Sequence, residues 1–150
     1  MEDIALALAE AKAIAADHGN AAVIGADQIL DCDGVWFDKP ATMVDARSHL
    51  QSLAGRTHRL ISTVCVAHGG TVRWRHVEIP CLTMRPFGNA FIDDYLTRAG
   101  PAVLESVGAY RLEDLGAHLF ERIEGDYFTI LGLPLLPLLA YLRQVGIVDG

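Results

Sequence analysis

Two long stretches in which apolar and polar residues alternate, 57–67 and 71–84, lie on either side of Gly69-Gly70. Alternation with a period of two residues is typical of a strand with one buried face. Glycine readily adopts the positive φ angles of a tight turn. The sequence therefore predicts a long antiparallel hairpin over residues 57–84, around which the rest of the chain must fold.

Shorter patterns predict the remaining elements. Asp33-Gly34 favours a two-residue hairpin turn, and Thr42 can cap the helix that follows it. We expect the Ala-rich first helix to end at His18-Gly19-Asn20. Residues 21–26 predict a central strand covered on both faces, with Asp27 where that strand ends. The predicted helices cover residues 4–16, 43–53, 89–99 and 135–145, and the other predicted strands cover 29–32, 35–37 and 118–123.

The order of these elements places the chain in the α/β class. Helices that alternate with strands, some of them in antiparallel hairpins, predict a mixed, twisted sheet with helices on both faces. With 150 residues, of which 51% are hydrophobic, the chain can bury one core and is too short to need a second. No repeat or low-complexity linker divides it. We therefore expect a single domain over residues 1–150.

The net charge and the apolar segments of the chain argue against two classes of protein, those that bind nucleic-acid polymers and those that insert into membranes. A net charge of −7 argues against binding to a nucleic-acid polymer, which depends on Lys and Arg at the phosphates. A small anionic ligand needs only a few local cations. The acidic first residues are unlike a signal peptide. The most apolar stretch, 131–142, contains prolines and is shorter than the ~20 residues that cross a bilayer. We expect no membrane insertion.

The cysteines and histidines indicate neither a disulfide framework nor a zinc site. Cys32, Cys65 and Cys81 include no close pair, which is typical of reduced thiols in the cytoplasm. The six histidines lack the spacing of zinc ligands. We therefore expect a cytoplasmic protein without zinc.

Asp27 is the first candidate for a chemical role. It follows a predicted buried strand with small residues just before it, Gly25-Ala26, which would let a ligand approach the backbone. Ligands often bind where the strands of an open α/β sheet end, so Asp27 is a candidate metal ligand or general base. An Asp at this position can equally be a turn or cap residue.

Two lysines are the candidate cations. Lys39 precedes a proline at the base of the short hairpin, which would hold an ammonium on a stiff backbone for a phosphate. Lys12 is the only charge in the apolar segment 11–16, so its head must reach either water or an anion. The alternative for both is an ordinary solvated lysine.

Three further acidic residues have two possible roles each, one in binding a ligand and one in forming a turn or loop. Glu124 and Asp126 follow a predicted strand and could place carboxylates near a metal, or could simply form a turn. Glu113 could accept hydrogen bonds from the N–H groups of a base, or could belong to a charged loop.

Taken in order, several motifs resemble those of the Maf family of nucleoside triphosphate pyrophosphatases, whose fold is similar to that of the ITPases. They cover nearly the whole chain and comprise Leu8-Ala9-Glu10-Ala11-Lys12-Ala13, Val23-Ile24-Gly25-Ala26-Asp27-Gln28, Gly34 to Lys39-Pro40, Leu53-Ala54-Gly55-Arg56-Thr57-His58, Ile92 to Gly100, Gly108-Ala109-Tyr110 and Ile123 to Leu135. Each motif is weak alone, but their shared order is specific.

The resemblance implies a hydrolase that cleaves a nucleoside triphosphate between its α and β phosphates, releasing a monophosphate and pyrophosphate. It implies a requirement for Mg²⁺ or Mn²⁺, with Asp27 binding the metal and activating the water. Lys12 and Lys39 would neutralise the triphosphate, and the protein would form a homodimer. Gln28 and Glu113 occupy the positions that differ between branches, and they look like the branch acting on 7-methyl-GTP rather than on dTTP and UTP.

The sequence also departs from the family pattern. It lacks the family's N-terminal strand, its Ser-x-Ser-x-Arg-Arg phosphate-binding loop and an acidic stretch, and Asp38 stands where the family usually has Gly. Two alternatives therefore stay open. The chain could be a catalytically impaired module for nucleotide binding or for regulation of cell division. It could also be a different metal-dependent phosphohydrolase that uses Asp27, Glu124 and Asp126.

Overall fold

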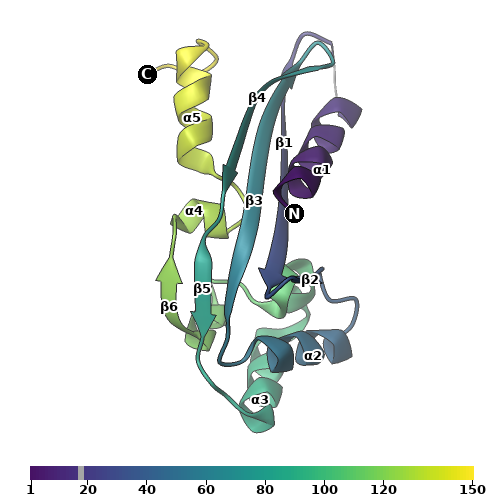
Figure 1. Cartoon of the computed structure of the whole chain (residues 1–150), viewed down its shortest axis with the longest axis vertical. Coiled ribbons are helices and arrows are strands. Elements are labelled where there is room, and N and C mark those ends of the chain that lie inside the picture. Colours follow the sequence, from purple (N-terminus) through teal and green to yellow (C-terminus); the bar gives the residue numbers. More distant parts are fainter. Residues whose placement is uncertain (17–18) are drawn as a thin grey trace. The chain divides into compact units, whose positions relative to one another are not determined.

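The computed structural model describes residues 1–16 and 19–150, so the predicted helix stop at His18 lies outside the described residues. The chain forms α1 (Glu2–Ala15), β1 (Ala22–Cys32), β2 (Val35–Phe37), α2 (Met43–Leu53), β3 (Thr57–His68), β4 (Thr71–Glu78), β5 (Cys81–Met84), α3 (Asn89–Ala99), β6 (Phe120–Glu124), α4 (Tyr127–Ile130) and α5 (Leu135–Gln144) (Figure 1). Short 3₁₀ turns connect α3 to β6. The strands form an open sheet in the order β2-β1-β3-β5-β6, with β4 also paired to β3. The predicted α/β class is confirmed.

The chain divides into two compact units. The first unit comprises residues 1–28, 61–79 and 126–150, and the second comprises residues 29–60 and 80–125. The single domain over residues 1–150 stays a prediction. Within the described ranges, no helix is both long and apolar enough to cross a lipid bilayer.

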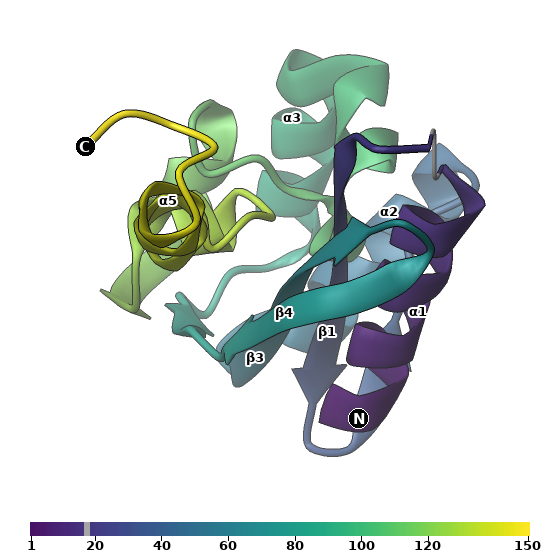
Figure 2. The same ribbon diagram turned by 90° about the horizontal axis from the view of Figure 1, so that it is seen from above.

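The first unit is built around the antiparallel β3–β4 hairpin. Ser62 pairs with Glu78 at one end and His68 with Thr71 at the other, as predicted from Gly69-Gly70. Helices α1 and α5 lie on opposite sides of these strands in both Figure 1 and Figure 2. Successive residues of a strand point to opposite faces, so both faces of β3 in this unit are covered.

The alternation along β3 is visible in its packing. Cys65 and Ala67 pack with Ala9 and Ala13 of α1. Their neighbours on the other face are buried with α5, in a cluster formed by Val64, Val66, Leu138 and Leu142. The strand covered on both faces is thus β3.

The prediction for residues 21–26 was wrong in two respects. Ile24 is 47% exposed, so this segment is not covered on both faces. The strand also does not end at Asp27, because β1 continues without a break to Cys32. Extended backbone can continue through a polar residue wherever a neighbouring strand supplies hydrogen bonds, and the sequence of one strand does not reveal its neighbour.

The second unit contains the short β1–β2 hairpin and the ladder β3–β5–β6. Cys32 pairs with Val35 across Asp33 and Gly34, which have φ angles of 52° and 85°, as the predicted two-residue turn requires. Thr42 caps α2 in a reciprocal capping box with Asp45. Proline cannot donate to a ladder, and the predicted strand 71–84 is divided into β4 and β5 at Ile79-Pro80.

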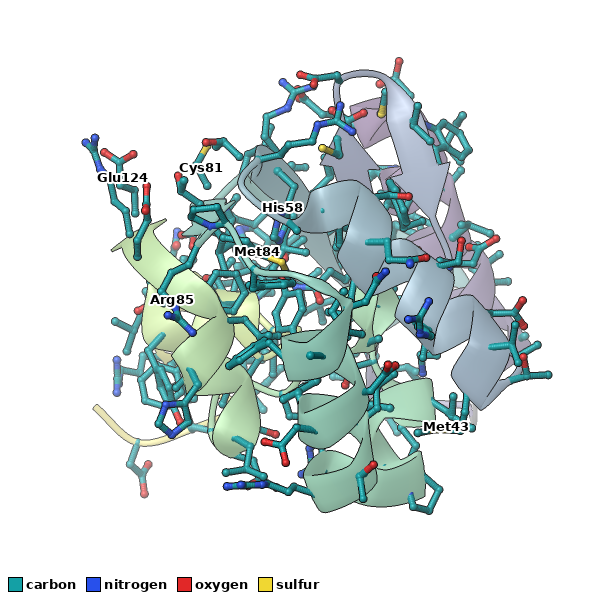
Figure 3. All side chains as sticks on the ribbon, turned by 90° about the horizontal axis from the view of Figure 1, so that it is seen from below. Met43, His58, Cys81, Met84, Arg85 and Glu124 are labelled. Atoms are coloured by element: carbon teal, nitrogen blue, oxygen red, sulfur yellow. The ribbon has the colours of Figure 1, made fainter. Side chains whose placement is uncertain are left out.

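The interior of the second unit lies around His58 of β3. In Figure 3 the side chains of His58 and Met84 lie among the helices and strands, whereas Glu124 projects outward from the end of β6. His58 Nε2 lies 2.8 Å from the hydroxyl of Tyr110, and its ring also contacts Phe120. Helix α2 is tied to α3 by an ion pair in which Arg47 Nε lies 2.7 Å from a carboxylate oxygen of Asp93.

Candidate active site

One ion pair of the first unit joins helix α1 to strand β1. The ammonium of Lys12 contacts Oδ1 of Asp27 and lies 3.4 Å from the carbonyl oxygen of Ala26. The Lys12 side chain is 59% exposed, and the Asp27 side chain is 14% exposed. An anion arriving from solvent can therefore reach the ammonium, while the carboxylate keeps a fixed position beside it.

Small residues bring the helix close enough for this contact. Ala5, Ala9 and Ala13 recur every four residues and form the buried face of α1. Ala9 and Ala13 pack against β1 at Gly25, which has no room for a side chain. Thr63 of β3 adds a polar link, because its hydroxyl lies 3.0 Å from the carbonyl oxygen of Ala5 and 3.2 Å from that of Asp27.

The side chain of Gln28 forms hydrogen bonds with residues other than those around Asp27. Its Nε2 donates to Ser62 Oγ at 2.7 Å, to the carbonyl oxygen of Thr129 at 3.1 Å and to that of Ile130 at 3.3 Å. Ser62 Oγ in turn donates to the Thr129 carbonyl oxygen at 3.1 Å. Gln28 thereby connects β1 to the last turn of α4.

Sequence reasoning missed Glu78 and Thr129. The Thr129 hydroxyl is 2.5 Å from Glu78 Oε2, and the other oxygen of Glu78 is 3.1 Å from His76 Nε2. Thr129 is completely buried. The two residues are far apart in the sequence, so no local spacing could have indicated the pair.

Asp126 and Glu124 take structural roles in their own units. Asp126 is the N-cap of α4, where its Oδ2 accepts a hydrogen bond from the Thr129 backbone N–H at 2.9 Å. Glu124 forms an ion pair of 2.7 Å with Arg122 on the exposed side of β6. The cap at Asp126 is the contact expected of the turn interpretation, whereas Glu124 is the last residue of strand β6 and pairs along it.

The remaining predicted residues lie in the second unit. Lys39 is exposed just after β2. Glu113 accepts a hydrogen bond of 2.9 Å from Arg111 Nε, and its side chain is 35% exposed. The hydrogen bond places the Glu113 carboxylate beside a guanidinium at a partly accessible position.

The donor set can be tested for a divalent cation. Within residues 1–16 and 19–150, no group of three or more His, Cys, Asp and Glu could hold a metal ion by itself. Mg²⁺ rarely needs such a cage, because it usually binds through one or two carboxylates together with substrate phosphates and water. Asp27 supplies one partly exposed carboxylate, so the residues present fit a cation shared with a triphosphate.

Comparison with known proteins identifies the family. The sequence model of the Maf-like proteins matches residues 1–145. The chain belongs to the Maf family. This Maf chain is 55% identical over 145 residues to the nucleoside triphosphate pyrophosphatase of Paramagnetospirillum magneticum (strain ATCC 700264 / AMB-1), a match that covers 95% of the chain and 75% of that protein.

Other relatives of the Maf chain have a more specific name. It is 51% identical over 150 residues to the 7-methyl-GTP pyrophosphatase of Rhizobium meliloti (strain 1021), covering 99% of the chain and 75% of that protein. It is 52% identical over 151 residues to the 7-methyl-GTP pyrophosphatase of Mesorhizobium japonicum (strain LMG 29417 / CECT 9101 / MAFF 303099), covering 99% and 76%. The family resemblance drawn from the motifs is confirmed.

Proposed function

We propose that this Maf chain is a nucleoside triphosphate pyrophosphatase, a hydrolase that splits the α–β anhydride bond to give a monophosphate and pyrophosphate. The observation that carries the proposal is the pair formed by the accessible ammonium of Lys12 and the Asp27 carboxylate. Relatives at about half identity over almost the whole chain carry the same activity in their names.

Asp27 is proposed as the carboxylate that receives the proton of the attacking water and provides a ligand for the metal. Proton acceptance by a positioned side chain contributes roughly 10²–10⁴ in rate. A divalent cation, Mg²⁺ or Mn²⁺, would supply Lewis-acid stabilisation of the charge on the departing pyrophosphate. Asp27 is suited to its task because small residues on α1 and β1 fix the backbone on which it sits.

Lys12 and Lys39 are proposed to neutralise the triphosphate. Each ammonium is a compact point charge that can follow phosphate oxygens as charge moves toward the leaving group. Lys12 has Asp27 as its counter-ion, and the exposure of its side chain lets a phosphate approach. Local cations of this kind explain how a protein of net charge −7 can bind a polyanion.

Gln28 and Glu113 are proposed to select the base, with 7-methyl-GTP as the preferred substrate. A carboxylate accepts hydrogen bonds only, so Glu113 suits the N–H groups on the edge of a guanine. The names of the relatives from Rhizobium meliloti and Mesorhizobium japonicum support the same substrate. We further propose a cytoplasmic homodimer that does not bind nucleic-acid polymers.

The deciding experiment measures pyrophosphate release from 7-methyl-GTP, GTP, dTTP, UTP and CTP in the presence of Mg²⁺. We expect pyrophosphate from the panel, with 7-methyl-GTP cleaved fastest. Release of single phosphates instead would favour a different phosphohydrolase. A folded chain that binds nucleotide but releases nothing would favour the impaired binding module. Chelation by EDTA should abolish release and restoration of Mg²⁺ should recover it.

A further inference from the structure

The amide of Gln28 has a defined orientation. Two of the three groups that face its Nε2 are backbone carbonyl oxygens, those of Thr129 and Ile130, which can only accept hydrogen bonds. The opposite orientation would place the amide oxygen against both carbonyls. The NH₂ group must therefore face the carbonyl oxygens of Thr129 and Ile130. Among the residues that the structure describes, none donates a hydrogen bond to the other end, Oε1.

The consequence is a side chain that can act only as an acceptor. A free glutamine presents donors and an acceptor with equal ease, so it cannot choose between complementary base edges. Here the NH₂ group of Gln28 already donates to Ser62, Thr129 and Ile130, so only Oε1 is left to bind a ligand, as an acceptor. The direction of this hydrogen bond depends on the two carbonyls at the end of α4 staying where they are.

Glu78 holds those carbonyls in place. Its Oε2 accepts the hydrogen of the buried Thr129 hydroxyl at 2.5 Å. A hydroxyl has one hydrogen, so this bond excludes donation to Asp126 Oδ2, which lies farther away at 3.1 Å. Asp126 instead accepts the Thr129 N–H. Helix α4 has only four residues and so makes few hydrogen bonds of its own, and the bond to Glu78 adds a tie from β4, outside the helix.

We propose that Glu78 is a positioning residue that acts through Thr129 to keep Gln28 as a hydrogen-bond acceptor, and that the site thereby selects purine bases with an exocyclic amino donor, such as guanine. This inference rests on the proposed function, because it requires a nucleotide base to reach Gln28. Glu78 touches neither the substrate nor the reacting atoms. It determines which base is preferred without taking part in the hydrolysis.

The test compares GTP with ITP, which share the triphosphate, the ribose and the ring and differ in the 2-amino group alone. One hydrogen bond contributes about 1 kcal/mol, so we expect kcat/KM to favour GTP by roughly fivefold in the natural chain. Glu78→Leu and Thr129→Val should bring this ratio close to one. Glu78→Gln and Thr129→Ser keep an acceptor or a hydroxyl and should keep the preference. Glu121→Leu, which removes an exposed carboxylate from β6, is the matched control and should leave the ratio unchanged.

A second readout does not depend on turnover. The side-chain NH₂ signals of Gln28 in ¹⁵N-labelled protein should be protected from hydrogen exchange in the natural chain, in Glu78→Gln and in Thr129→Ser, and should lose protection in Glu78→Leu. A natural chain without preference for GTP, or folded Glu78→Leu and Thr129→Val variants with unchanged ratio and unchanged protection, would overturn the inference. Absence of pyrophosphate from every nucleotide would instead count against the proposed function, while the exchange measurement would still decide whether Glu78 positions Gln28.

Discussion

Ala9 and Gly25 pack so closely that a Cβ atom added at Gly25 would lie 2.1 Å from the carbonyl oxygen of Ala9. The same Cβ would lie 2.8 Å from the Cβ of Ala13. Both contacts are shorter than real Cβ atoms allow, and backbone cannot move aside as a flexible side chain can. The contact therefore sets the distance between α1 and β1, and with it the distance between Lys12 and Asp27.

Gly25→Ala should damage both stability and activity. The added methyl must push α1 away from the strand, and overpacking of this kind costs about 1–3 kcal/mol in the free energy of unfolding. Because α1 carries Lys12, we also expect KM for the nucleotide to rise. Urea unfolding and steady-state kinetics measure the two effects.

Gly88→Ala provides the matched control. Nothing lies within 4 Å of a Cβ built at Gly88, and this glycine has a negative φ of −99°. We expect a change of less than about 1 kcal/mol, from its place as the N-cap of α3, and unchanged kinetics. Equal kinetic effects of the two substitutions would show that the close packing at Gly25 does not position Lys12.

Asp27→Asn should remove activity while leaving the fold intact. The substitution keeps the size of the side chain but removes the charge that the proposed mechanism uses to accept a proton. We expect kcat to fall at least about a hundredfold, with the midpoint of urea unfolding nearly unchanged because the asparagine amide oxygen can still accept a hydrogen bond from the ammonium of Lys12. Retained turnover, or unfolding of the variant, would exclude the proposed role of Asp27.

Elements with a local signal were predictable from sequence. The capping residue Thr42, the turn residues Asp33 and Gly34, and the glycines of the β3–β4 turn each act on their immediate neighbours, and the predicted elements around them are present. A cap or a tight turn is decided within four or five residues, and the sequence displays those residues directly.

Features that depend on distant partners were not predictable. The continuation of β1 past Asp27 and the burial of β3 on both faces are decided by which strands and helices lie alongside. The contact between Glu78 and Thr129 joins residues 51 positions apart. Lys12 and Asp27 were each singled out by composition and motif, but only the packing of α1 on β1 shows that they meet.

Removing either lysine should weaken substrate binding. Lys12→Met and Lys39→Met keep most of the apolar stem and delete the ammonium. Hydrogen bonds to charged groups contribute roughly 1.5–3 kcal/mol, so we expect KM for the nucleotide to rise by about tenfold or more in each variant. Arg73→Met, which removes an exposed cation from β4, should leave KM within about twofold at moderate salt. An equal effect of all three substitutions would indicate a general charge effect rather than a phosphate site.

Buried His58 should make the protein less stable in acid. Burial lowers its pKa from 6.5 to about 4, and its Nδ1 has no hydrogen-bond partner among the described residues. Between these two pH values the unfolded chain binds a proton that the folded chain does not. The free energy of unfolding therefore falls as the pH decreases from 6.5 toward 4, by a total of about 3 kcal/mol from this residue.

Urea unfolding at pH 7, 6 and 5 measures this dependence, with His58→Asn as the comparison because asparagine does not titrate. The variant should be less stable than the natural chain at pH 7, since Tyr110 and Phe120 lose a well-packed ring. Its stability should nevertheless decline less steeply between pH 7 and pH 5. Other buried or paired groups affect both proteins equally, so the difference between the two slopes belongs to His58. Identical slopes would mean that His58 takes up its proton in the folded chain as readily as in the unfolded one.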